Sequence, residues 1–561
     1  MGNIEIARLL RKIAAAYTIL GENRFKIIAY ENAATAIEHA TSELKDLWED
    51  GELDSIPGLG ASITSHLDEI FKTGKSKHFE EILKKINPKV FPLLDVPGIG
   101  PKKALQIVKT GKVPGYLQEN IERYKKGAIK ERRMSLPDAD AIAEELIDYL
   151  KPFKVDKLGS LRRGVATIGD IDLAVATTQP EKVIEAFVAY PKAVGLVEKG
   201  PTGASILLSA GRQADLRVAK PAEYGAMLQY FTGSKYHNIR LRDFALKKGF
   251  SLSEYGIKKI GKAEDRRQKM DSGKQKTEKF ETEEEFYHFL GLEYILPELR
   301  EDSGEIEASL MHKLPKLITL ENIKGDLQMH SSDLQETSHD SGGDSIRVMR
   351  EMGEMRGYEY IGISDHNPKK GSNLNLLTKR NQIIDHINSS KPKCRVIKLL
   401  EVDILPSGGL PVPQQALDEL DGCLVSIHSS FSMNREMMTK RVLAGLANPV
   451  AKILAHPTGR LLGSREGYEL DWDQIFRFCL ENDKALEINA YPNRLDLPDT
   501  LVREAVKRGV KLSLGTDAHN KAGLEMMPYG VSVARRGWAQ AENIVNTMDF
   551  HEIIKWLHRR I

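Results

Sequence analysis

Seven short apolar runs in residues 321–561 each end on a polar side chain, and most of these side chains can bind a metal. The stretches between the runs are long enough for helices. Strands that alternate with helices predict a parallel sheet. Polar groups at the C-terminal ends of successive strands are typical of the active face of a TIM-like barrel. The runs are Lys324–His330, Tyr360–His366, Val396–Glu401, Cys423–His428, Lys452–His456, Ala485–Asn489 and Lys511–His519.

The strand-end side chains are candidate metal ligands. Imidazole and carboxylate groups bind zinc, manganese or iron, and no cysteine is among them. A lone histidine at a strand end is usually a satisfied polar group, but a set that converges on one rim predicts a metal site. Glu401 is the candidate bridging ligand and catalytic group, because metals that it holds can activate a water molecule to attack a phosphodiester. The set is His330, His366, Glu401, His428, His456, Asp517 and His519.

Residues 1–320 show a different organisation. The spacing of Ile6, Leu9, Leu10 and Ile13 predicts helices in residues 1–86, and helices are expected to continue through residues 87–150. Short strand-like runs from residue 153 onward predict a mixed α/β unit. Charged, broken sequence predicts a loop at 258–279 and a linker at 305–320. A chain of 561 residues with these changes of pattern is expected to be multidomain.

Two pentads of the same pattern, Ile56–Gly60 and Val96–Gly100, each precede a helical segment. They resemble helix-hairpin-helix modules, in which glycines let the backbone approach a phosphate and a helix N-terminus supplies N–H donors. One pentad could be an ordinary turn. The pair, followed by ten Lys and Arg against three acids in residues 101–133, predicts contact with the DNA backbone. The candidate contacts are Gly58, Gly60, Gly98, Gly100, Lys102 and Lys103.

A glycine-serine turn and three aspartates predict a nucleotidyl-transfer site. The turn Gly159-Ser160 enters a helix and can cradle an anion, to which Arg163 adds a charged fork. Asp170 and Asp172 stand at positions i and i+2 of a strand, so their carboxylates share one face. With Asp215 from a later strand, they can hold two hard cations for in-line attack on a phosphate.

With these features, residues 1–315 resemble the family X DNA polymerases. The stretch Tyr230-Phe231-Thr232-Gly233-Ser234 is the feature that most clearly indicates this family and not only the wider nucleotidyltransferase superfamily. The resemblance implies that Tyr230 and Phe231 lie against the incoming sugar, and that Arg242 contacts the template. It also implies gapped or primed DNA and dNTPs as partners, Mg²⁺ or Mn²⁺ at the aspartates, and a monovalent cation at the hairpins. The nucleotide-binding residues would be Ser160, Arg163, Gly169, Tyr230, Phe231, Gly233 and Asn238.

Residues 321–561 resemble the PHP (polymerase and histidinol phosphatase) domain through Ser364–Asn367, Ala455–Pro457 and Gly515–His519. The resemblance implies Mn²⁺ or Zn²⁺ at the strand ends. The family usually opens with His-x-His, whereas this chain has Gln328-Met329-His330, so one of the usual three metal positions is expected to be weak. The next family ligand is an aspartate, for which Asp340 is the candidate and Asp333 the competitor.

Two other departures concern the polymerase half. Where repair members of family X carry a Schiff-base lysine, this chain has His66, so lyase chemistry by that route is not expected. Gln213 stands two residues before Asp215, where such a relative has arginine, and altered control of domain closure is expected.

The expected domains follow from the two resemblances. We expect an all-α DNA-binding domain at 1–86, a fingers-like helical domain at 87–150, an α+β nucleotidyltransferase palm at 151–233, a thumb-like region at 234–316 and an α/β TIM-like PHP barrel at 321–561. The expected function is a repair polymerase that fills short gaps, with 3'-5' exonuclease, 3'-end-processing or AP endonuclease activity in the barrel. The alternatives for the barrel are a small-molecule phosphatase and a non-catalytic structural module.

Composition excludes several other classes of protein. Hydrophobic residues make up 41% of the chain, and no uncharged apolar window reaches the length of a membrane span. The N-terminus lacks a signal segment, and Cys394, Cys423 and Cys479 are too far apart in sequence to suggest a disulfide framework. The expectation is a monomeric cytoplasmic protein associated with the nucleoid.

Overall fold

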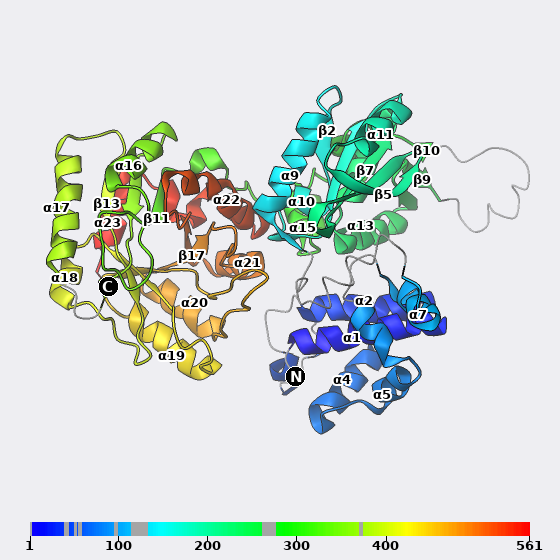
Figure 1. The fold of residues 1–561 in the computed structure, drawn as a ribbon, viewed down its shortest axis with the longest axis horizontal. Coiled ribbons are helices and arrows are strands. Elements are labelled where there is room, and N and C mark those ends of the chain that lie inside the picture. The colour runs from blue at the N-terminus through cyan, green and yellow to red at the C-terminus, as the bar shows by residue number, and fades with distance from the viewer. Residues whose placement is uncertain are drawn as a thin grey trace, which may run out of the picture. The chain divides into compact units, whose positions relative to one another are not determined.

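The computed structural model describes residues 3–38, 44–49, 53, 59–94, 99–113, 133–260, 277–369 and 374–560. The chain splits into two compact units, Met1–Arg132 and Arg133–Ile561, which are described one after the other (Figure 1). Among the helices described, none combines the length and the apolar character needed to cross a membrane.

The first unit is built from helices around one apolar core. Helix α1 packs along α2, and their buried residues include Ile6, Leu10 and Tyr17. Gly60 and Gly100 are the N-caps of α4 and α7, and a Cβ added at either glycine would meet no other atom within 4 Å. Gly58 and Gly98 lie outside the described residues. The helices are α1 (Asn3–Leu20), α2 (Arg24–Glu38), α3 (Leu44–Glu49), α4 (Ala61–Thr73), α5 (Lys77–Lys84), α6 (Phe91–Leu94) and α7 (Pro101–Thr110).

The second unit begins with a five-stranded mixed sheet of order β2-β4-β7-β6-β5. Only β4 and β7 are parallel in this sheet, and their register places Asp172 opposite Asp215. Helices α9 and α11 contribute buried apolar residues to the core of this unit, so the larger unit takes in residues 133–150. The elements are β1 (Met134–Ser135), α9 (Leu136–Tyr149), β2 (Val155–Lys157), α10 (Gly159–Arg162), β3 (Thr167–Ile168), β4 (Ile171–Ala176), α11 (Pro180–Val188), β5 (Ala193–Gly200), β6 (Gly203–Leu208) and β7 (Gln213–Ala219).

A smaller core follows, in which a buried ion-pair network joins α10 to later segments. Glu283 accepts hydrogen bonds from Arg300 at 2.6 Å and from Arg162 at 2.5 Å, and Arg300 is fully buried. A buried charge is tolerated when it is paired in this way. The elements are α12 (Tyr224–Thr232), α13 (Lys235–Lys247), β8 (Phe250–Ser253), β9 (Gly256–Lys259), β10 (Thr277–Glu278), α14 (Glu283–Phe289), η5 (Pro297–Leu299) and α15 (Glu305–Leu310).

The strands of residues 321–561 form two parallel sheets that join into a ring. The bridges His366–Glu401 and Met329–Ala518 link the three-stranded sheet β11-β12-β13 to the five-stranded sheet β14 to β18. Each of the seven predicted runs contains all or most of a strand, which confirms that part of the prediction. The strands are β11 (Gly325–Met329), β12 (Tyr360–Ile363), β13 (Arg395–Lys398), β14 (Glu401–Asp403), β15 (Cys423–Ser426), β16 (Ala451–Leu454), β17 (Ala485–Asn489) and β18 (Lys511–Gly515).

Most of the helices of this region lie around the outside of the ring (Figure 1). They are α16 (Ile346–Met355), α17 (Asn375–Ser389), α18 (Gln414–Asp418), α19 (Arg435–Leu446), α20 (Trp472–Glu481), α21 (Asp499–Arg508) and α22 (Met527–Arg536). The last helix, α23 (Phe550–His558), instead packs Trp556 and Leu557 in one apolar cluster with strand residues such as Leu327, Leu424 and Ile453.

Helix α22 ends in a buried arginine that joins three segments of the larger unit. Arg536 donates to Asp499 at 2.6 to 2.8 Å and to Glu301 at 2.9 Å, and its Nη1 also donates to the backbone carbonyl of Arg163 at 2.9 Å. The nearby Arg535 pairs with Glu298 at 2.7 Å. The packing of α22 on η5 thus carries ion pairs that connect the strand ring to the polymerase-like half.

Candidate active sites

Three aspartates lie at or near the N-terminal ends of β4 and β7, two neighbouring strands in the interior of the mixed sheet. Asp172 lies in β4 and Asp215 faces it from the parallel strand β7, while Asp170 lies just before β4. Asp215 is 9% exposed, whereas Asp170 is exposed to solvent. Gln213, at the start of β7, donates through Nε2 to both carboxylate oxygens of Asp215, at 3.0 and 3.2 Å. The structure therefore brings together all three carboxylates that the sequence suggested.

Burial of Asp172, together with the charges of Asp215 and Asp170, raises the pKa of its carboxyl to about 7. Carboxylates held this close repel one another, so the site favours a group that supplies positive charge. The backbone packs directly against Asp172, because a Cβ on Gly159 would lie 2.2 Å from its Oδ2. Gly159 also has a φ of +57°, which a larger residue would adopt only with strain. The donor set therefore suits divalent cations.

Arg163 follows helix α10 and is held by two acceptors. Its Nε donates to Glu301 at 2.9 Å and its Nη1 donates to the carbonyl of Thr232 at 2.6 Å. Although burial opposes the charge on Glu301, Arg536 and Arg163 lower its pKa to about 2, so this carboxylate is ionised. Ser160 and Gly169, the other predicted triphosphate residues, lie in the same turn region around α10 and β4.

The predicted sugar and base contacts form a second cluster on α12 and α13. Tyr230 and Phe231 pack edge to face with ring centroids 5.1 Å apart, and Gly233 ends α12 with a φ of +71°. Asn238 donates to the carbonyl of Tyr230 at 2.7 Å. Arg242 lies 5.9 Å from the Tyr230 ring centroid. These contacts hold the aromatic pair and Asn238 in one fixed arrangement.

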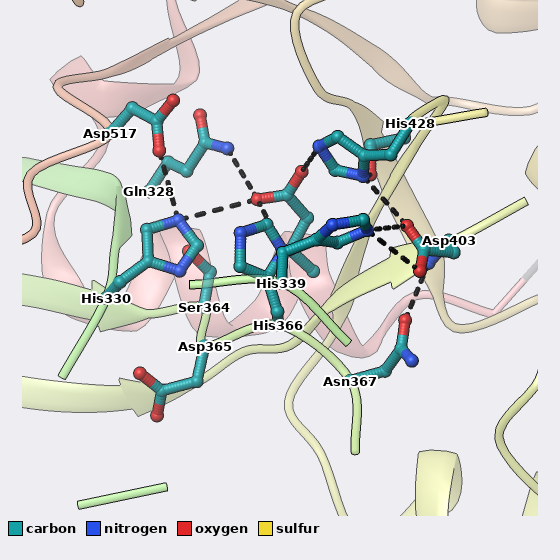
Figure 2. Close-up of polar contacts among 12 residues, drawn as sticks. Gln328, His330, His339, Ser364, Asp365, His366, Asn367, Asp403, His428 and Asp517 are labelled. Atoms are coloured by element: carbon teal, nitrogen blue, oxygen red, sulfur yellow. Dashed lines mark hydrogen bonds and ion pairs between the residues drawn. The ribbon is translucent and has the colours of Figure 1, made fainter. Parts of the chain in front are cut away.

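In the strand ring, four of the predicted metal-binding histidines surround Glu401, which is 1% exposed. Figure 2 shows three of them, His330, His366 and His428, close together. One carboxylate oxygen lies 2.9 Å from His456 Nε2 and 3.5 Å from His428 Nε2. The other oxygen lies 3.5 Å from His330 Nε2 and 3.7 Å from His366 Nδ1. Four histidines around one buried carboxylate are the arrangement that the sequence suggested for a bridging ligand.

Several overlapping groups in this cluster could hold a metal ion, with all ligand atoms of a group within 4.8 Å of one another. They are His330/His366/His519, His366/Glu401/His428, His330/Glu401/Asp517 and His339/Asp403/His428. His366 keeps a buried Nδ1 without a hydrogen-bond partner, 3.7 Å from the Glu401 carboxylate, which fits a site completed by a cation. Burial lowers the pKa of His456 to about 4, so its imidazole is neutral and has a lone pair to donate.

The loop after β11 distinguishes the two candidate aspartates. Asp340 Oδ2 lies 3.2 Å from His519 Nε2, and its Oδ1 lies 3.5 Å from His366 Nε2. Asp333 instead accepts a hydrogen bond from the backbone N–H of Ile346, in the first turn of α16, at 2.7 Å. The geometry therefore favours Asp340 as the ligand and gives Asp333 a helix-capping role.

Only His366 of the motif Ser364-Asp365-His366-Asn367 reaches the metal cluster. Asp365 accepts from the backbone N–H of Ser331 at 2.5 Å. Asn367 Oδ1 accepts from the N–H of Asp403 at 2.8 Å (Figure 2). The other motif residues thus fix the neighbouring loops in place.

Comparison with known proteins identifies the family. The DNA polymerase/3'-5' exonuclease PolX of Bacillus subtilis is 34% identical over 587 aligned positions, which cover 99% of both chains. This chain belongs to the PolX family of family X DNA polymerases. Residues 1–76 match the helix-hairpin-helix domain family, and residues 227–301 match the DNA polymerase beta thumb family.

Two more distant relatives each match part of this PolX chain. DNA polymerase lambda of Rattus norvegicus is 25% identical over 335 residues, covering 53% of this chain and 56% of the relative. A probable phosphatase of Acetivibrio thermocellus is 28% identical over 184 residues, covering 31% of this chain and 73% of the relative.

Sequence reasoning missed four polar residues beside the PolX metal cluster. His339 Nε2 lies 3.0 Å from Asp403, which in turn lies 2.8 Å from His428 Nδ1. Asn489 and the buried Glu487 lie on β17, and burial raises the pKa of the Glu487 carboxyl well above its usual range. Two signals could have found some of them: Asp403 shares a strand face with Glu401, two positions away, and Asn489 ends one of the predicted runs.

Proposed function

We propose that this chain fills short gaps in DNA by template-directed nucleotidyl transfer at Asp170, Asp172 and Asp215. The observation that carries the proposal is the register of Asp172 opposite Asp215 on paired parallel strands, with the partly buried Asp172 packed against the Gly159 turn. Membership of the PolX family and the match to the DNA polymerase beta thumb support it. Divalent cations, when bound at these carboxylates, would activate the primer hydroxyl and stabilise the charge that develops on the phosphate.

The chain's own groups position the substrates in this proposal. Arg163 is held by Glu301 and Thr232, so its remaining N–H donors are available to the triphosphate. Tyr230 and Phe231 form a wall for the sugar. Glycines at the N-termini of α4 and α7 leave open space for a phosphate backbone to approach.

We further propose that residues 321–561 form a PHP barrel that removes nucleotides from DNA 3' ends. Glu401 with its four surrounding histidines carries this part of the proposal. The Bacillus subtilis relative, which is named a DNA polymerase/3'-5' exonuclease, supports it. The residues that would hold Mn²⁺ or Zn²⁺ are His330, Asp340, His366, Glu401, His428, His456, Asp517 and His519.

A second candidate function for the barrel is hydrolysis of a small phosphomonoester, because one relative is named a probable phosphatase. Both functions use the same metal chemistry, so only the substrate separates them. We would incubate the full chain with Mn²⁺ and either a 3'-recessed duplex or a small phosphomonoester. Digestion of the duplex, with slow turnover of the phosphomonoester, is the expected result. Rapid turnover of the phosphomonoester with an intact duplex would favour the phosphatase, and inactivity on both would favour a structural role.

The polymerase assignment has its own test. Wild-type protein should insert one nucleotide into a gapped duplex in the presence of Mg²⁺, whereas Asp215→Ala protein should not. Insertion at the wild-type rate by the variant would contradict the assignment of the site.

A further inference from the structure

One corner of the metal cluster is lined by hydrogen-bond donors. This corner, called here the Gln328 corner, consists of Gln328, His330, Glu401 and Asp517. His330, Glu401 and Asp517 have ligand atoms close enough to share a cation. Gln328, which is fully buried, stands where the PHP resemblance implies a histidine. What the glutamine presents to the corner therefore decides whether a cation can bind there.

The orientation of the Gln328 amide is set by a chain of contacts that starts at a backbone N–H. The N–H of Tyr491 donates to Asn489 Oδ1 at 2.9 Å. A backbone N–H can only donate, so the Asn489 oxygen must face it and the Asn489 Nδ2 must face the other way. That Nδ2 lies 3.0 Å from Gln328 Oε1, which must then accept. The Gln328 Nε2 is thereby turned toward Glu401 Oε2, at 2.9 Å.

Gln328 consequently offers Glu401 an N–H and not a lone pair. The amide nitrogen has no lone pair available for a cation, and the amide oxygen is turned toward Asn489 while the nitrogen faces Glu401. The space for a different arrangement is small, because a Cβ on Gly515 would lie 2.6 Å from Gln328 Cβ and 2.3 Å from Glu487 Oε1. The glutamine is packed in the donor orientation.

Asp517, the second carboxylate of the corner, is also met by donors. Asn489 Nδ2 lies 3.2 Å from Asp517 Oδ2, and Arg494 Nε lies 3.5 Å from the same oxygen. The guanidinium brings a positive charge to this carboxylate. Asp517 Oδ1 receives His330 Nε2 at 3.0 Å. Amide and guanidinium groups thus contact the carboxylates of Glu401 and Asp517 at the position where a cation would otherwise neutralise their negative charge.

The His366 side of the cluster shares Glu401 with the Gln328 corner, but its histidines contact carboxylates and not amide or guanidinium groups. His366, His428 and Glu401 face one another there, and His366 Nδ1 is buried without a hydrogen-bond partner. His366 and His519 also approach Asp340. The two sides of one cluster therefore differ in chemistry: one presents lone pairs and the other presents N–H groups.

We propose that the barrel binds its cations on the His366 side and none in the Gln328 corner, where Gln328, Asn489 and Arg494 take the place of a metal ion. This inference rests on the proposed metal-dependent function of the barrel. It replaces the expectation of a weak metal position beside Gln328 with no metal position there, because the glutamine acts as a donor. It also removes Asp517 from the proposed metal ligands.

The test measures bound Mn²⁺ per chain by elemental analysis for full-length wild type, Gln328→Ala and Gln328→His. The polymerase site contributes equally to all three proteins, so differences report the barrel. Removal of a donor should leave the metal count of Gln328→Ala equal to that of wild type. A histidine supplies a lone pair, so Gln328→His should gain about one Mn²⁺ per chain.

A lower metal count in Gln328→Ala would show that the glutamine is a ligand and would overturn the inference. An unchanged count in Gln328→His would overturn it as well. His366→Ala tests the proposed function separately: it should lose Mn²⁺ relative to wild type. If it does not, the barrel does not use these residues for metal, and both the proposed metal site and this inference are wrong.

Discussion

Gln213 Nε2 lies 3.0 Å from one carboxylate oxygen of Asp215 and 3.2 Å from the other. The amide fixes the carboxylate without adding a charge. We predict that Gln213→Ala lowers the rate of nucleotide insertion by about 10- to 100-fold, the range expected for losing a hydrogen bond to a charged group. Single-turnover insertion into a gapped duplex measures this. Gln213→Arg, which restores a donor, should recover most of the rate, and a fast Gln213→Ala enzyme would show that Asp215 needs no such support.

Asp172→Ala and Asp170→Ala should each abolish gap filling, because these carboxylates are the proposed cation ligands. DNA binding should persist, because the proposed backbone contacts belong to the helix N-termini of the first unit. Gap filling and duplex affinity would be measured on the same protein preparations. Insertion by either variant near the wild-type rate would remove that aspartate from the site.

Glu301 is predicted to position Arg163 for the triphosphate. Glu301→Gln keeps the shape but loses the charge that holds the Arg163 guanidinium, so KM for the dNTP should rise by about tenfold, with a smaller change in kcat. Glu298→Gln is the matched control, because Glu298 pairs with Arg535 and not with Arg163. Equal KM values for the two variants would argue against this role of Glu301.

His366→Ala should eliminate Mn²⁺-dependent removal of 3'-terminal nucleotides and spare gap filling, since the two proposed metal centres use different residues. The assay is digestion of a 3'-recessed duplex. His386→Ala should digest normally, because His386 is an exposed residue of α17 outside the metal groups. Asp215→Ala should also digest, and persistent digestion by His366→Ala would place the nuclease elsewhere.

DNA affinity should depend on salt through the second hairpin. Replacing Lys102 and Lys103 by glutamine should reduce the slope of log affinity against log salt by up to about two, because each phosphate contact contributes about 0.9. Lys84→Gln with Lys85→Gln removes the same charge from the region of α5 and serves as the control. A slope that falls equally in both double variants would show a general charge effect.

The strands of the ring could be predicted because buried parallel strands are continuous apolar runs, and polar residues at their ends stand out against them. Glu401 and the strand-end histidines follow directly from that pattern. The donor role of Gln328 could not be predicted, because it depends on Asn489 and Tyr491, which lie far away in sequence. Asp340 could be separated from Asp333 only by loop geometry, since both occur in the same polar stretch.

In the polymerase half, strand periodicity, in which alternate residues share a face, predicted Asp170 and Asp172 together in one strand. The structure begins β4 at Ile171, so Asp170 lies just before the strand and only Asp172 lies in it. The contact of Glu301 with Arg163 could not be predicted from the sequence, because no local pattern connects residues that are so distant in the chain. The domain boundaries at 86, 150, 233 and 316 stay predictions, although the division at Arg132/Arg133 places α9 with the sheet that it covers.

The buried Arg536 makes dissection of the protein by truncation a biased experiment. Glu301 belongs to the polymerase-like half, yet one of its two arginine partners comes from α22 at the far end of the chain. Ending the chain before residue 321 would leave Glu301 with only Arg163, and would also strip the Arg163 carbonyl of a donor. If a shortened polymerase binds nucleotides poorly, the cause could therefore be the loss of the Arg536 contacts with Glu301 and Arg163, and not weak binding by the intact site. Point substitutions in the intact chain keep these contacts and are therefore better suited to assign the polymerase and nuclease activities to one half of the chain or the other.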